Sequence, residues 1–150
     1  MKIKTVHPIN FLHHQAETTI QQLSSFFPVS AKLMKEAARY GLTLAGPMHW
    51  HYKNFMGDET QPFILEMSLP VVALPEKYEG EFMLKRTEPF RCVSAVHEGK
   101  WTDIPNTYAS IMQFMEANAL QPSIENRELY IQVDFENQDA NVTEIQMGIL

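Results

Sequence analysis

The sequence predicts an α+β fold made of two β-α-β-β repeats related by a pseudo-twofold axis. A pair of residues first suggests the duplication: Tyr52 precedes Glu66 by 14 residues, and Tyr130 precedes Glu144 by the same 14, with 78 residues between the pairs. Each Glu also lies in an apolar run that breaks four residues later, at a Pro or a Gly. Finally, both halves of the chain show the same order of strand and helix patterns.

The first repeat spans about residues 9–72. Strands are predicted at 11–16, 48–52 and 63–72. Apolar residues at helical spacing predict a helix between the first two strands, from about residue 20 to residue 40, interrupted at Pro28. Gly41 follows as a left-handed cap.

A connector of about residues 73–87 leads into the second repeat, about 88–150. Strands are predicted at 90–96, 128–135 and 144–150. Thr102 and Asp103 offer an N-cap to a helix whose first turn contains Pro105, where a missing N–H is harmless. Residues 1–150 are therefore expected to form a single domain.

Composition narrows the function classes. With 18 acidic and 12 basic residues the net charge is −6, and no basic cluster is present, so direct nucleic-acid binding is not expected. No apolar run approaches the ~18 residues of a membrane span, and the N-terminus lacks a signal-peptide core. Cys92 is the one cysteine, which excludes an internal disulfide. We expect a cytoplasmic protein.

Strand alternation assigns faces to the candidate site residues. Leu129, Ile131 and Val133 are expected to face a helix, which leaves Tyr130 on the opposite face together with Glu144. In the first repeat Trp50 shares a face with Tyr52, and by the repeat Glu66 shares one with Ser68. These non-helix faces are either solvated, with carboxylates paired to Arg91, Arg127 or Lys53, or they enclose an aromatic cleft containing carboxylates.

Three short motifs resemble the GyrI-like domain family. The run from Ser94 to Trp101 resembles its strand, His-x-Gly-x-aromatic, helix entry. The segments Arg127–Tyr130 and Thr143–Ile145 resemble its "RE-x-Y … TEI" ending, and Gly46-Pro47 before the aromatic strand resembles its first-half segment. The order and spacing of these motifs cover most of the chain.

The resemblance implies a ligand cleft between the two repeats, as in the effector-binding domains of multidrug regulators such as BmrR and Rob. It implies that Glu144 pairs with a small amphipathic, cationic or aromatic ligand. Tyr130, Tyr52 and Trp50 would form the aromatic walls, with cation–π attraction of ~0.5–2 kcal/mol each, and Glu66 would add a second polar contact. No cofactor or metal is expected: no His is singled out as the axial ligand that the similarly folded haem-binding SOUL proteins would need, and the His residues lack matching carboxylate ligands.

Two other functions remain open. Some family members resemble hydrolases of strained-ring or electrophilic xenobiotics, in which Glu144 or Glu66 would activate water and Tyr130 would protonate the leaving group. A third possibility is a protein partner, as for inhibitors of DNA gyrase. The same residue types serve binding and hydrolysis, so whether the protein is an enzyme stays undecided from the sequence.

Overall fold

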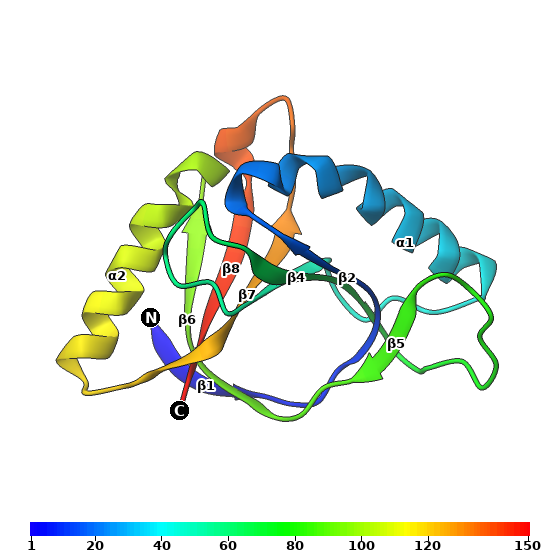
Figure 1. The fold of residues 1–150 in the computed structure, drawn as a ribbon, viewed down its shortest axis with the longest axis horizontal. Coiled ribbons are helices and arrows are strands. Elements are labelled where there is room, and N and C mark those ends of the chain that lie inside the picture. Colours follow the sequence, from blue (N-terminus) through cyan, green and yellow to red (C-terminus); the bar gives the residue numbers. More distant parts are fainter.

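The computed structural model describes residues 1–150 as one eight-stranded antiparallel sheet with two helices (Figure 1). The strand order is β1-β6-β8-β7-β3-β4-β2-β5. The elements are β1 (Lys2–Val6), β2 (Asn10–Thr18), α1 (Phe27–Arg39), β3 (His49–Lys53), β4 (Phe63–Val71), β5 (Met83–Arg86), β6 (Phe90–Glu98), α2 (Ile104–Ala117), β7 (Pro122–Gln132) and β8 (Val142–Ile149). The predicted α+β class and the two β-α-β-β units are confirmed.

The sheet itself shows the pseudo-twofold symmetry. From the central pair β3 and β7 outward, β4 and β2 follow on one side and β8 and β6 on the other. Trp50 and Glu128 are direct cross-strand partners in that central pair. They are also separated by 78 residues, the offset that relates Tyr52 to Tyr130, so the pseudo-twofold axis passes between Trp50 and Glu128.

Strands β1 and β5 at the two edges of the sheet were not predicted from the sequence. Each precedes one repeat in the chain but pairs with the other: β1 pairs with β6, and β5 pairs with β2. Both are short, so neither gives a clear alternation pattern. The two repeats thus exchange their edge strands, and this exchange links each repeat to the other along the sheet edges.

Both helices cover the same face of the sheet (Figure 1). A proline lies in the first turn of each, where no backbone donor is needed. The predicted stretch before Pro28 forms a separate 3-10 helix, Ile20–Phe26, and Gly41 takes the left-handed conformation with φ 65°. Leu33 packs in the core of the first repeat and Ile111 in that of the second. Neither helix is long and apolar enough to cross a membrane.

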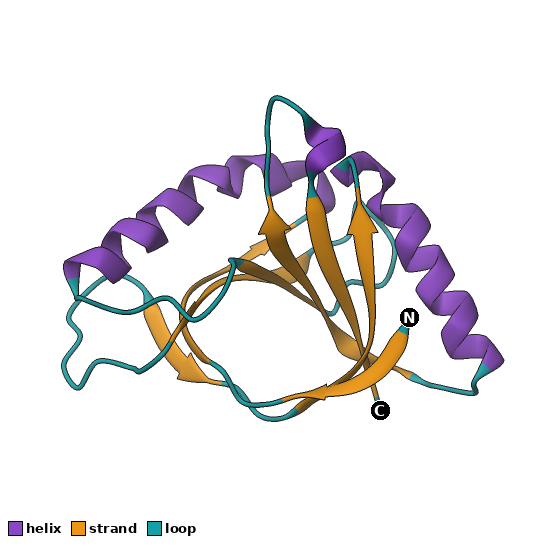
Figure 2. Ribbon diagram, turned by 180° about the vertical axis from the view of Figure 1, so that it is seen from behind, coloured by secondary structure: helices purple, strands orange, loops and turns teal.

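The helix-free face is also buried, because the sheet curls strongly around it (Figure 2). Phe11, His51, Cys92 and Ser68 all point to this face and are 0% exposed. Burial raises the pKa of the Cys92 thiol to about 11, so this thiol is held in its unreactive form. The sheet therefore has two interiors, one under the helices and one inside the curl.

The predicted faces of β7 are wrong. Leu129 points into the curl, and Ile131 is 52% and Val133 42% exposed. The residues of β7 on the helix-covered face include Asn126, Glu128 and Tyr130. A buried carboxylate was not expected there, because apolar residues normally occupy a helix-covered face.

Candidate functional site

A carboxylate lies buried under the helices at the centre of the sheet. Glu128 is 6% exposed and accepts hydrogen bonds from three tyrosine hydroxyls. Tyr130 donates to Oε2 at 2.6 Å, Tyr52 donates to Oε2 at 3.0 Å, and Tyr108 donates to Oε1 at 3.1 Å. These bonds satisfy much of the capacity of an ionised carboxylate, which accepts and does not donate.

Three elements bring these groups together. Glu128 and Tyr130 lie two residues apart on β7 and therefore share a face. Tyr52 reaches them from β3, the neighbouring strand, and its hydroxyl is 3.5 Å from that of its repeat equivalent Tyr130. Tyr108 comes from the second turn of α2. The site thus depends on both repeats and on one helix.

The electrostatics of Glu128 differ from those of an ordinary ion pair. Burial raises the pKa of its carboxyl, and the three phenol hydrogen bonds only partly oppose that shift. No Lys or Arg forms an ion pair with it. Burial, and the neighbouring carboxylate, raise the pKa of Tyr52, Tyr108 and Tyr130 well above the ordinary value, so the phenols remain donors. The site is a buried carboxyl group without a cationic side chain beside it.

Aromatic rings pack around Tyr130, next to this carboxylate. Trp50 and Trp101 each meet the ring of Tyr130 edge-on, with centroids 5.8 Å and 5.5 Å away. Phe27, at the start of α1, lies 5.8 Å from Trp50 and 6.1 Å from Trp101. Phe135, from the β7–β8 connection, completes the group against Trp101 and is 66% exposed. We call Trp50, Trp101, Phe27 and Phe135 the aromatic cover.

The predicted site residues fall on two faces. Trp50, Tyr52 and Tyr130 come together under the helices, at the interface of the repeats. Glu144 and Glu66 lie on the opposite face, inside the curl of the sheet. The expectation that Glu144 shares a face with Tyr130 is therefore wrong, for the reason given above: the helix-facing residues of β7 are the polar ones.

The two predicted carboxylates already have counter-ions. Glu144 pairs with Lys4 at 2.6 Å, and Glu66 pairs with Lys53 at 2.6 Å and with Lys85. Burial alone would raise the pKa of each carboxyl, but the hydrogen bonds and charges of these partners outweigh it and lower both. Lys4 and Lys85 belong to the exchanged edge strands β1 and β5, so each duplicated Glu holds one edge strand.

Glu128 was not chosen from the sequence. A signal for it existed: Glu128 and Tyr130 alternate on one strand as Trp50 and Tyr52 do on another, at the same offset of 78 residues. Pairing these two strands at the pseudo-twofold axis places all four side chains on one face. The strand order, which the sequence did not supply, was the missing information.

Comparison with solved structures places this fold among known ones, whereas neither a protein-family model nor a curated protein sequence matches the chain. EcmrR in its complex with DNA superposes with TM-score 0.80 at 20% identity; the match covers 99% of this chain and 56% of EcmrR. This chain thus spans little more than half of that protein's length. The isolated EcmrR C-terminal domain gives TM-score 0.79 at 19% identity over 99% of this chain and 96% of the domain.

Two further structures are similar over nearly the whole chain. SAV2435 bound to tetraphenylphosphonium gives TM-score 0.70 at 9% identity, covering 99% of this chain and 93% of SAV2435. A hydrolase from Listeria innocua, encoded by lin2189, gives 0.66 at 16% identity, covering 99% and 91%. At such identities the likeness is one of fold. The shared fold is the α+β fold of two β-α-β-β repeats that the sequence predicted.

Proposed function

We propose that this protein binds a small, amphipathic aromatic cation, with Glu128 as the charge anchor and Tyr52, Tyr108 and Tyr130 around it. One observation carries the proposal: Glu128 is a buried carboxylate with three neutral donors and no cationic partner. An unpaired buried charge is costly, and a ligand cation would offset that cost.

The surroundings favour a delocalised cation over a compact one. A quaternary or aromatic cation loses little hydration on burial, whereas an ammonium loses much. The faces of Trp50, Trp101 and Tyr130 each offer cation–π attraction of about 0.5–2 kcal/mol. Entry requires the aromatic cover to move, because Glu128 is 6% and Tyr52 7% exposed.

Glu144 and Glu66 remain predictions as ligand contacts, but the geometry favours Glu128. A cation at Glu144 would have to displace Lys4, and one at Glu66 would have to displace two lysines. The resemblance in fold to SAV2435, which was solved with tetraphenylphosphonium, supports a small-molecule role without fixing the ligand.

The test is a calorimetric titration of tetraphenylphosphonium into wild-type protein, Glu128→Gln and Glu144→Gln. We expect Glu128→Gln to weaken binding at least tenfold, which corresponds to about 1.4 kcal/mol, and Glu144→Gln to leave the affinity within twofold. The reverse pattern would assign the anchor to Glu144. Equal affinities in all three proteins would exclude both carboxylates.

Hydrolysis is the alternative, favoured by the fold shared with the Listeria innocua hydrolase and by the raised pKa of Glu128. With an epoxide, Glu128 would take a proton from a water whose oxygen bonds to the ring carbon as the C–O bond breaks. Tyr52 or Tyr130 would protonate the released oxygen, and the proton on Glu128 would return to that tyrosine through their hydrogen bond.

Mass spectrometry of the protein incubated with styrene oxide decides between these functions. Diol formation that disappears in Glu128→Gln and in Tyr130→Phe supports hydrolysis. Binding of phosphonium without diol formation above the buffer rate supports the binding function alone.

A further inference from the structure

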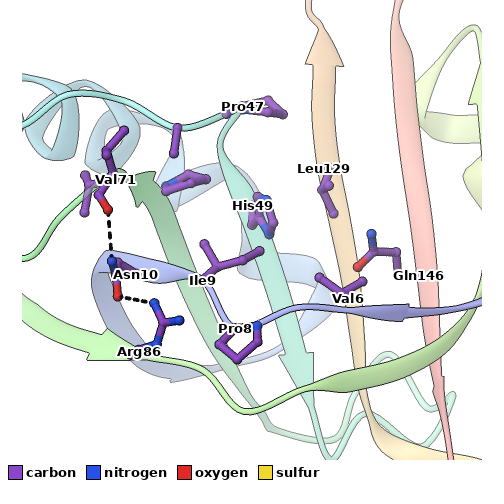
Figure 3. A pocket seen from close by; sticks show the side chains of 14 residues that line it. Val6, Pro8, Ile9, Asn10, Pro47, His49, Val71, Arg86, Leu129 and Gln146 are labelled. Carbon is purple, nitrogen blue, oxygen red and sulfur yellow. Dashed lines mark hydrogen bonds between the residues drawn. The ribbon is translucent and has the colours of Figure 1, made fainter.

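A cavity of about 460 Å³ is lined by residues from the inner side of the curl, among them His49 and Leu129 (Figure 3). Glu128 lies on the other side of the sheet. The cavity opens at the end of the curl, where the β1–β2 and α1–β3 connections meet the ends of β4 and β5. Its volume falls within the range of about 300–1,000 Å³ that is usual for small-ligand pockets. Its walls are mainly apolar and include Val6, Pro8, Ile9, Pro47 and Leu129.

Two buried polar side chains form the inner end of the cavity. His49 projects from β3 and Gln146 from β8, and they are 3% and 2% exposed (Figure 3). The Gln146 amide Nε2 donates to Glu144, whose carboxylate can only accept. That bond fixes the orientation of the amide. The opposite atom, Gln146 Oε1, is buried without any hydrogen-bond partner.

His49 leaves a second polar atom without a protein partner. Its Nδ1 lies 3.1 Å from His51 Nε2, and its Nε2 has no hydrogen bond to the protein. Burial, with the nearby charge of Arg127, lowers the pKa of His49 to about 3, so the ring is neutral at physiological pH. An unmet buried acceptor costs about 1–3 kcal/mol, so the inner end favours a ligand that donates a hydrogen bond to Gln146.

The mouth of the cavity favours a negatively charged group on the ligand. Arg86 is exposed there, and its guanidinium donates to Asn10 Oδ1 at 3.1 Å. Asn10 in turn donates to the carbonyl of Val72 at 3.1 Å, which holds this pair at the rim. No acidic residue lines the cavity. The only formal charge on the lining is therefore positive and lies at the entrance.

We propose that this cavity is a second ligand site, for a small amphipathic acid. The ligand's uncharged hydroxyl or amide N–H enters first and donates to Gln146 Oε1 beside His49. Its apolar body lies against the proline and aliphatic walls, and its carboxylate stays at the mouth near Arg86. The proposal is independent of cation binding at Glu128, since the two sites use opposite faces of β3 and β7.

Three compounds probe each end of the site. The probe, 4-hydroxyphenylacetate, has a donor at one end and a carboxylate at the other. Phenylacetate lacks the donor, and 4-ethylphenol lacks the carboxylate. Amide chemical shifts in ¹⁵N-labelled protein report where each compound binds, and their titration gives the dissociation constants.

We expect the probe to shift the amides of residues 45, 46, 48, 49, 71, 72 and 146, and to bind about tenfold tighter than either control compound. Gln146→Leu removes the acceptor at similar size and should weaken the probe about tenfold while leaving phenylacetate unchanged. Gln132→Leu, the same change at an exposed site on β7, should alter neither. Glu128→Gln should also leave probe binding unchanged.

Val72→Trp provides a second test that leaves the buried polar groups intact. Val72 lines the mouth and is 60% exposed, so a larger side chain should block entry without disturbing the fold. Probe binding should then be lost. The proposal is overturned if the amides that line the cavity do not shift, or if Val72→Trp binds the probe normally. It is also overturned if phenylacetate binds as tightly as the probe, because a water molecule would then satisfy Gln146 Oε1 in place of the ligand.

Discussion

Tyr52 Oη on β3 donates a 3.0 Å hydrogen bond to Glu128 Oε2 on β7, which joins the two repeats at a buried carboxylate. Tyr130, the repeat equivalent of Tyr52, donates to the same oxygen at 2.6 Å. The duplication thus supplies two matching hydroxyls on either side of the pseudo-twofold axis. At the axis itself the symmetry is broken, because Trp50 faces Glu128 where a symmetric pair would have two like residues.

Tyr130→Phe should destabilise the fold by about 1–2 kcal/mol, because it removes the shortest of the three hydrogen bonds to a buried carboxyl group. Urea unfolding at pH 7 measures the change. Tyr40→Phe is the matched control: Tyr40 packs on Tyr78, but its hydroxyl makes no hydrogen bond, so a change below about 0.5 kcal/mol is expected. Equal effects of the two substitutions would argue against a stabilising role for the Tyr130 hydroxyl.

Glu128 should also leave a pH signature on stability. Burial raises its folded-state pKa above the ordinary value of 4.5, so the folded protein binds more protons than the unfolded chain in the window between the two values. The contribution of Glu128 to the free energy of unfolding therefore falls as pH rises through that window. Glu128→Gln should gain stability relative to wild type from pH 4.5 upward, as measured by urea unfolding at several pH values. A difference that does not change with pH would contradict the raised pKa.

Lys4→Met should loosen the edge strand β1. The charge and hydrogen bond of Lys4 help to lower the pKa of Glu144 against its burial, and the stability that this pair adds is lost as pH falls through the lowered value. Because Lys4 is partly exposed, the expected cost at pH 7 is only about 0.5–1 kcal/mol. Hydrogen exchange should quicken in β1.

The control for that prediction lies on the same strand. Lys2 is exposed and forms no ion pair, so Lys2→Met should leave exchange in β1 unchanged. If both substitutions quicken exchange equally, the Lys4–Glu144 pair does not hold the strand.

Phe135→Ala should speed ligand entry. Phe135 is 66% exposed and closes the aromatic cover against Trp101 and Phe27, so its loss opens the cover at little cost in stability. Stopped-flow tryptophan fluorescence reports the step directly, because Trp50 and Trp101 both belong to the cover. A several-fold faster association with tetraphenylphosphonium is expected. An unchanged rate would place the entrance elsewhere.

The sequence predicted the elements better than it predicted their faces. Both helices and six of the eight strands follow from periodicity, because strong apolar patterns are local. The faces of β7 could not be read locally. Leu129 packs inside a curl that no helix covers, whereas Glu128 points under the helices because three phenols from other elements satisfy it. That arrangement depends on strand order, which is a long-range property.

The role of the duplicated Glu residues was also hidden for a physical reason. Lysines on β1 and β5 neutralise Glu144 and Glu66, and each lysine reaches its partner only because the edge strands are exchanged between the repeats. Short edge strands leave little pattern in a sequence. The sequence offered Lys53 as one counter-ion, and Lys53 does pair with Glu66, but Lys4 and Lys85 were not foreseen as partners.

The most direct test of the central claim compares two ligands of the same shape that differ only in charge, trimethylanilinium and tert-butylbenzene. The ratio of the two affinities, measured for wild-type protein and for Glu128→Gln, gives the preference of each protein for the cation. Wild type should prefer the cation at least tenfold, about 1.4 kcal/mol, and Glu128→Gln should lose that preference while it still binds the neutral ligand. The same preference for the cation in both proteins would show that Glu128 is not the charge anchor.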